Sequence, residues 1–236
     1  MEQDFLSLIR TFLSTTEYAD IEIPIFKLVF TENIYNYVLQ DDPEYAKRIM
    51  GDTIYGMYYV TKNYEQQLII ENTDNIVEIM HNLFHEMIHI LDFNALAKHK
   101  NNYNIRELQD DTFFILWSEF HAEYCSYKYL INCAKESIFP QNVQIEIQRK
   151  FASYFNQHIR LEIQYAADFC VRLYGQYIAL YDVFEDDVDM YPSQFYINSD
   201  FLDIYNYLNK HKTFEKIKDN FEELERIFRR LESNKK

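Results

Sequence analysis

Glycine is scarce in this sequence. Its 236 residues include only Gly51, Gly56 and Gly175. A loop that cradles a phosphate needs several glycines close together, because the backbone must approach the phosphate without a Cβ in the way. Three scattered glycines therefore exclude a P-loop and a dinucleotide-binding fingerprint.

Positive charge is also in short supply. Lys and Arg together number 23 against 38 Asp and Glu, which gives a formal net charge of −15 and a pI near 4.8. A protein that binds nucleic acid needs a basic surface to neutralise the phosphates. We therefore expect no nucleic-acid partner, and the acidic balance favours a basic protein partner through long-range steering.

Cysteines are few and long apolar runs are absent. Cys125, Cys133 and Cys170 form no CxxC pair, which is typical of a reducing compartment. The first residues are acidic where a signal peptide would be basic, and no stretch of about 18 apolar residues occurs. We therefore expect a cytoplasmic protein that does not enter a membrane.

Periodicity predicts an α+β fold that is predominantly α. A short helix over 4–13 precedes an extended stretch over 21–30, where Pro24 disfavours a central strand. Residues 53–60 and 67–71 are rich in β-branched and aromatic residues and predict a small antiparallel sheet. After Asp74, a good N-cap, the pattern becomes helical with a broad apolar face.

The remainder is predicted to be helical. We expect a helix over 111–134, long helical patterns after Pro140 to about residue 183 with Gly175 as a break, and a tail helix over 213–231. The apolar face of the tail packs either on the protein itself or on a partner protein. The acidic cluster over 185–189 is either a solvated loop or a site for a hard cation.

The segment His85-Glu86-Met87-Ile88-His89 matches the pattern H-E-x-x-H within a predicted helix. Histidines at i and i+4 project from one face of a helix, so both imidazoles can reach a single Zn²⁺. Glu86 follows the first histidine and can take a proton from metal-bound water as a general base. The motif therefore predicts a catalytic zinc site, one Zn²⁺ per chain.

A second helix supplies the remaining groups of that site. Catalytic zinc takes three protein ligands and keeps one position open. Glu119 and Glu123 lie at i and i+4 on the predicted helix over 111–134. One of them can bind the metal, while the other accepts the N–H of a ligating histidine. Their alternative is a solvated acidic edge of an amphipathic helix.

In this order the elements resemble the gluzincin zinc metallopeptidases, and within them the ImmA/IrrE family. The resemblance covers roughly residues 50–131: a short sheet, the H-E-x-x-H helix, and Glu119-Phe120-His121-Ala122 as an E-x-x-A segment. It implies that His85, His89 and Glu119 are zinc ligands, that Glu86 is the general base, and that Glu123 supports a ligating histidine. It also implies a compact protease that acts on protein regulators.

Other residues near these motifs have two interpretations each. Asp92 is either a hydrogen-bond acceptor for a ligating histidine or a surface residue. His81 either joins the metal-binding face or is partly exposed. His121 is expected to play no part in ligation, because it points to another side of its helix. The group that stabilises the oxyanion is not identified by the sequence, and three candidates are Tyr154, His158 and Tyr165.

Together these features predict a single metallopeptidase-like domain over 1–236, with a core at about 50–135 and a helical extension at about 140–236. Its expected function is zinc-dependent hydrolysis of peptide bonds in a protein or peptide substrate. The alternative is a metal-binding interaction or regulatory protein with a protease-like fold and little or no catalysis. The expected edge strand for an extended substrate is 67–71.

Overall fold

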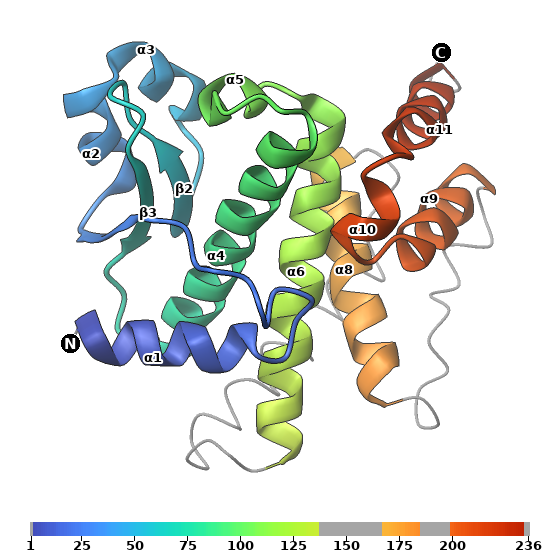
Figure 1. Ribbon diagram of the computed structural model, residues 1–236, viewed down its shortest axis with the longest axis horizontal. Helices are drawn as coiled ribbons and strands as arrows, with labels where there is room; N and C mark the ends of the chain where they lie inside the picture. Colours follow the sequence, from blue (N-terminus) through green and yellow to red (C-terminus); the bar gives the residue numbers. More distant parts are fainter. Residues whose placement is uncertain (1, 137–166, 185–198, 234–236) are drawn as a thin grey trace. The chain divides into compact units, whose positions relative to one another are not determined.

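The computed structural model describes residues 2–136, 167–184 and 199–233 (Figure 1). The chain divides into two compact units, Met1–Asp110 and Asp111–Lys236. Helices predominate and one small sheet lies in the first unit, so the predicted α+β, predominantly α fold class is confirmed. The predicted single domain over 1–236 includes both units and stays a prediction.

The first unit consists of short helices, a sheet and one long helix. Its elements in chain order are α1 (Glu2–Leu13), β1 (Lys27–Thr31), α2 (Ile34–Asp41), α3 (Pro43–Ala46), the 3-10 helix η1 (Lys47–Ile49), β2 (Gly56–Val60), β3 (Gln66–Glu71), α4 (Ile76–His99) and α5 (Ile105–Leu108). The helix predicted over 4–13 and the two strands predicted within 53–71 are thus confirmed. The short helices α2, α3 and α5 were not predicted.

The sheet has the order β1-β3-β2 and is mixed. Strands β2 and β3 pair antiparallel, as predicted, whereas β1 pairs parallel with β3. Strand β3 is therefore central, and the prediction that 67–71 is a free edge is wrong. Its apolar run Leu68–Ile70 is fully buried, as a central strand requires. Pro24 lies before β1, outside the hydrogen-bonded ladder.

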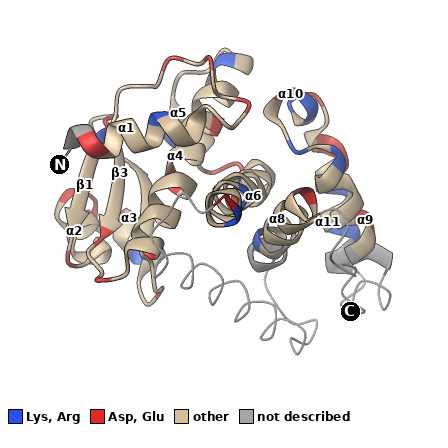
Figure 2. Ribbon diagram, turned by 90° about the horizontal axis from the view of Figure 1, so that it is seen from below, with Lys and Arg blue, Asp and Glu red and all other residues tan. Residues whose placement is uncertain are grey.

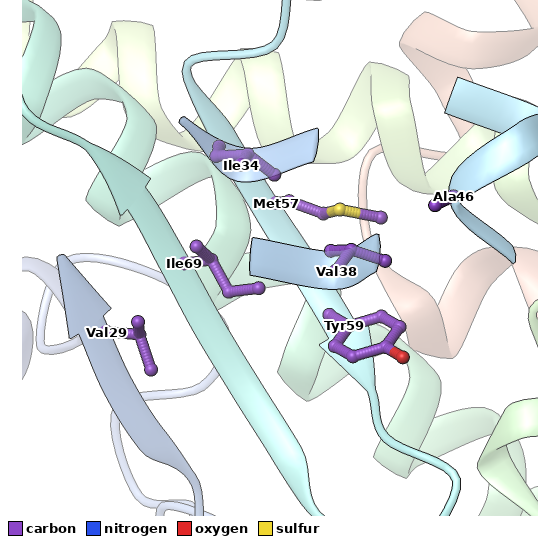
Figure 3. Close-up of a cluster of buried hydrophobic side chains, with 7 residues drawn as sticks. All are labelled: Val29, Ile34, Val38, Ala46, Met57, Tyr59 and Ile69. Atoms are coloured by element: carbon purple, nitrogen blue, oxygen red, sulfur yellow. The ribbon is translucent and has the colours of Figure 1, made fainter. Parts of the chain in front are cut away.

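Helices cover both faces of this sheet (Figure 1). On one face, side chains of β1, β2 and β3 pack against α2 and α3 in a buried cluster (Figure 3). The cluster comprises Val29, Ile34, Val38, Ala46, Met57, Tyr59 and Ile69. On the other face the sheet packs on α4, where the rings of Tyr58 and Phe93 are 5.7 Å apart. Side chains alternate along a strand, so Met57 and Tyr59 face one layer and Tyr58 the other.

Helix α4 is the central element of the first unit. Its N-cap is Asn75, whose side-chain oxygen accepts hydrogen bonds from the backbone N–H groups of Val77 (3.0 Å) and Glu78 (3.3 Å). The predicted cap, Asp74, is one residue too early. An amide oxygen at this position satisfies two of the N–H groups that the first turn leaves without partners.

The N-terminal segment is packed on α4. The rings of Phe12 on α1 and Phe84 on α4 are stacked with centroids 4.5 Å apart. Beyond α1, the hydroxyl of Tyr18 donates a 2.5 Å hydrogen bond to Asp92, and both side chains are buried. An aromatic contact and a buried hydrogen bond therefore attach the described part of this segment, residues 2–18, to the helix that carries the motif.

The elements described in the second unit are all helices. It contains α6 (Thr112–Lys135), α8 (Ala167–Val183), α9 (Ser199–Lys210), α10 (Phe214–Ile217) and α11 (Phe221–Ser233). Asp111 caps α6 by accepting a hydrogen bond from Phe114 N. Acidic and basic residues are both found along these helices (Figure 2). Helix α8 continues through Gly175, so the predicted break there is wrong.

The tail packs within its own unit. Leu224, Ile227 and Phe228 of α11 are buried, and α11 contacts α6 and α9. The indole N–H of Trp117 on α6 donates a 2.9 Å hydrogen bond to the carbonyl of His211, which follows α9. The apolar face of the tail is thus used inside the second unit. A partner protein at the remaining surface of the tail stays a prediction.

Some predictions lie outside the described residues: the acidic cluster at 185–189 and the oxyanion candidates Tyr154, His158 and Tyr165. Among the helices that the structure describes, none combines the length and the apolar character needed to cross a membrane.

Candidate metal centre

The two motif histidines converge on α4. The Nε2 atoms of His85 and His89 are 3.0 Å apart, and both side chains are buried. Their rings lie nearly at right angles, with centroids separated by 4.7 Å. Zinc bound tetrahedrally at about 2.0–2.1 Å from each of two imidazole nitrogens keeps those nitrogens about 3.3 Å apart. The observed pair therefore fits a shared metal ion.

Glu86 lies on a neighbouring side of α4 and points at the sheet. Its Oε2 accepts a 2.7 Å hydrogen bond from the backbone N–H of Tyr58 in β2, and 8% of the residue is exposed. A charged carboxylate at this depth needs a hydrogen-bond donor. The strand supplies that donor and fixes the direction of the side chain.

The N–H of Tyr58 is available because of the register of the β2–β3 pair. Glu71 N donates to Tyr55 O, and Thr61 N donates to Glu65 O. In an antiparallel pair, residues alternate between bonding the partner strand and pointing away from it. Tyr55 and Thr61 both bond the partner strand, and Tyr58 is three residues from each of them. The N–H and C=O of Tyr58 therefore point away from β3. Glu86 binds at this outer side of β2.

Gly56, at the start of β2, makes the approach of α4 sterically feasible. A Cβ placed on Gly56 would lie 2.9 Å from Asn82 Cβ, 3.2 Å from Glu86 Cγ and 3.3 Å from Glu86 Oε1. Contacts below 3.0 Å are not tolerated without movement of one partner. Glycine at this position thus lets the strand lie directly against the turn of α4 that carries Glu86.

His81 and Asp92 are both buried, which excludes one of the two interpretations of each residue. His81 is 8% exposed, so the expectation of a partly exposed histidine is wrong, and its ring centroid lies 5.8 Å from that of His85. Asp92 is fully buried and accepts the hydrogen bond from Tyr18. It is therefore not a surface residue of the helix end.

The two glutamates of α6 each contact a side chain of α8. Glu119 Oε2 forms a 2.9 Å ion pair with Arg172 Nη2, and Glu123 Oε2 accepts a 3.2 Å hydrogen bond from Gln176 Nε2. Glu123 is 4% exposed, so it is not part of a solvated edge. Arg172 and Gln176 were not predicted as residues of this site. Their own i, i+4 spacing, which repeats that of the two glutamates, is the signal that could have identified them.

Gly175 lies where α8 crosses α6. A Cβ at this position would lie 2.6 Å from Phe120 O and 2.9 Å from both Glu123 Cβ and Tyr124 N. The backbones of the two helices are therefore as close as only glycine permits. Like Gly56, this glycine lies beside a glutamate of the predicted site.

His121 occupies a different environment from the glutamates on the same helix. It is 1% exposed, and its ring stacks on Trp117 with centroids 4.7 Å apart and an interplanar angle of 25°. Its expected absence from the metal site stays a prediction.

Among the residues that the structure describes, five His and Glu side chains have the donor atoms and burial suited to holding a metal ion. They are His81, His85, His89, Glu119 and Glu123. Three belong to α4 in the first unit and two to α6 in the second. Each unit thus carries one part of the predicted ligand set.

In comparisons with known proteins, no family model, no curated protein and no solved structure matches the chain. The resemblance to the ImmA/IrrE metallopeptidases therefore rests on the residues of the motifs and their order.

Proposed function

We propose that this protein hydrolyses peptide bonds in a protein or peptide substrate with the help of one zinc ion. The main support for the proposal is the geometry of the H-E-x-x-H motif on α4. The Nε2 atoms of His85 and His89 lie 3.0 Å apart, while the carboxylate of Glu86 is hydrogen-bonded to the neighbouring strand. A histidine pair for a structural metal has no need of an oriented carboxylate beside it.

In this proposal His85, His89 and Glu119 hold the metal, and Glu123 supports a ligating histidine through its carboxylate. The proposal requires α4 of the first unit and α6 of the second to face one another. Two neutral imidazoles and one carboxylate are a donor set that suits zinc in catalytic sites. When bound, zinc polarises a substrate carbonyl and lowers the pKa of water towards neutrality.

Glu86 is the proposed general base. Its carboxylate takes the proton of the attacking water and returns it to the leaving amine, so it ends each cycle unprotonated. The hydrogen bond from Tyr58 N holds Oε2, which restricts the carboxylate to one orientation. A fixed base loses little orientational entropy when the reaction begins.

The outer side of β2 is the proposed edge for an extended substrate, in place of 67–71. Tyr58 O points away from β3, while Tyr58 N, on the same side of the strand, already donates to Glu86. A peptide bound along an exposed strand edge is held by main-chain hydrogen bonds, which are independent of its sequence. At this edge its backbone would lie next to the proposed base.

The metal is tested by elemental analysis of the purified protein. We expect about one zinc per chain, lost in His85→Ala and in Glu119→Ala. His99→Ala is the matched control, because His99 is an exposed histidine at the end of the same helix and should leave the zinc content unchanged. A folded wild-type protein without metal would overturn the metal site.

Catalysis is tested by comparing the wild type with Glu86→Gln on a peptide library prepared from a proteome. The amide introduced by this substitution keeps an oxygen for Tyr58 N but cannot act as a base, so zinc should be retained and cleavage lost. Cleavage by both proteins would contradict the role of Glu86. Zinc bound by both with cleavage by neither would favour a metal-binding interaction or regulatory protein.

A further inference from the structure

Helix α8 presents two side chains to the two glutamates of α6 in matching register. Arg172 and Gln176 are separated by four residues, as are Glu119 and Glu123. Arg172 Nη2 lies 2.9 Å from Glu119 Oε2, and Gln176 Nε2 lies 3.2 Å from Glu123 Oε2. In each glutamate the contact is made by Oε2. The two donor residues lie about one turn apart on α8.

The register of this contact is fixed by packing. Gly175 lies between the two donor positions, and its Cα approaches the backbone of α6 so closely that a Cβ would lie 2.6 Å from Phe120 O. Sliding α8 by one residue would bring a larger side chain to this point. Arg172 and Gln176 thus cannot exchange their partners without separating the two helices.

The Gln176–Glu123 and Arg172–Glu119 contacts differ in how far they are exposed to solvent, and this difference indicates different roles. The side chain of Gln176 is buried with Glu123, so that contact satisfies a carboxylate inside the protein. The Arg172 side chain is 44% exposed, whereas that of Glu119 is 15% exposed. An ion pair this accessible to solvent adds little to stability. It can nevertheless restrict how the Glu119 carboxylate turns.

We propose that Arg172 is a positioning residue for Glu119: its guanidinium holds Oε2, so that the carboxylate is presented to a metal in one orientation. This inference rests on the proposed function, because Glu119 is a ligand only there. Groups that hydrogen-bond a metal-binding carboxylate orient it and tune the metal. In this inference Arg172 acts on the metal through Glu119 and takes no part in the reaction itself.

The test is zinc affinity, measured by competition with a chromophoric chelator in the absence of any substrate. We compare the wild type, Arg172→Gln, Arg172→Lys, Glu119→Gln and the double variant Arg172→Gln/Glu119→Gln. Arg172→Gln should weaken zinc binding about 10–100-fold, with partial recovery in Arg172→Lys. In the Glu119→Gln background the same substitution should have no further effect, because Arg172 acts through that carboxylate.

The control is Arg226→Gln, which removes an exposed arginine paired with Glu223 on α11 of the same unit and should leave zinc affinity unchanged. Thermal unfolding of the metal-free proteins should be the same for Arg172→Gln and the wild type. A loss of thermal stability that parallels the loss of affinity would overturn the proposal in favour of a structural role.

The remaining outcomes distinguish this inference from the proposed function. If the wild type binds zinc and Glu119→Gln weakens it, but Arg172→Gln binds equally or more tightly, the positioning role is wrong and the metal site stands. Additive losses in the double variant would also overturn it, because Arg172 would then act independently of Glu119. If the wild type binds no zinc, both proposals fail together.

Discussion

The carboxylate of Glu86 accepts a hydrogen bond from the backbone N–H of Tyr58 across 2.7 Å, between the motif helix and the strand beside it. The donor belongs to the backbone, so no substitution of the Tyr58 side chain removes it directly. The alternation of the β2–β3 ladder, which turns this N–H away from β3, sets its direction. The proposed general base is therefore oriented by strand register.

Replacing Gly56 by Ala should disturb this arrangement. The added Cβ would lie 2.9 Å from Asn82 Cβ, which cannot move without moving α4, and 3.2 Å from Glu86 Cγ. Overpacking of this kind costs about 1–3 kcal/mol. Urea unfolding should show that loss, and any peptide hydrolysis should fall with it because Glu86 is displaced.

Gly51→Ala is the control for that substitution. Gly51 has a φ of +93° and no atom within 4 Å of a Cβ, so its replacement strains the backbone without touching Glu86. We expect it to lose stability while hydrolysis by the folded protein is retained. Equal stability of Gly56→Ala and the wild type would contradict the close packing of β2 against α4.

Two opposing effects determine how Gly175→Ala changes the free energy of unfolding. Helix propensity favours Ala over Gly by about 1 kcal/mol in a helix interior. The Cβ would, however, lie 2.6 Å from the backbone oxygen of Phe120, so α6 and α8 would have to separate. We expect a net loss of about 1–3 kcal/mol in the free energy of unfolding. A more stable variant would contradict the close crossing.

Tyr18→Phe should destabilise the protein although the ring is kept. It removes the donor of a 2.5 Å hydrogen bond to Asp92, a carboxylate that is fully buried. Loss of a donor to a buried polar group costs about 1–3 kcal/mol. Chemical unfolding should show this loss for Tyr18→Phe and a change within about 0.5 kcal/mol for Tyr103→Phe, since Tyr103 is 73% exposed. Equal effects of the two substitutions would argue against the buried contact.

Acid should destabilise the second unit through Asp182. Burial alone would raise the pKa of this carboxyl group, but hydrogen bonds from Tyr124 and Lys212 and the charges of Lys212 and Lys128 outweigh burial and lower the pKa below its ordinary value of 3.8. A lowered pKa in the folded state stabilises the protein above the unfolded pKa, and this stabilisation is lost as pH falls through the folded pKa.

The free energy of unfolding should therefore decrease as the pH falls below about 4. Asp182→Asn should reduce that dependence, because the asparagine cannot titrate. Asp203→Asn is the control, since Asp203 is a half-exposed partner of Arg230 in the same unit. Urea unfolding followed between about pH 5 and about pH 2 measures both slopes. An unchanged slope in Asp182→Asn would contradict the prediction.

The elements with strong periodicity were predictable from the sequence, whereas the sheet topology was not. The apolar spacing identified α4 and located its start to within about a residue, and it located both ends of α6 to within a residue. The parallel pairing of β1 with β3 joins residues about forty positions apart, and no local pattern specifies it. For the same reason the sequence could not show that β3 is central.

The convergence of the two motif histidines was predictable from the sequence, whereas the surroundings of the candidate residues were not. The spacing of His85 and His89 implies convergence, which the 3.0 Å separation of their Nε2 atoms confirms. Gly175, in contrast, was expected to break a helix, because its intrinsic propensity is the only property visible without the facing backbone of α6. Arg172 was overlooked because its partner lies more than fifty residues away.

The attachment of the N-terminal segment to α4 limits how far the chain can be shortened. A fragment that starts at residue 50, where the resemblance to the metallopeptidases begins, would keep His85, Glu86 and His89. It would lose β1, which pairs along one whole side of β3, and the contacts of Phe12 and Tyr18 with α4. A fragment chosen by its motifs alone would therefore expose the apolar surface of the helix that carries them.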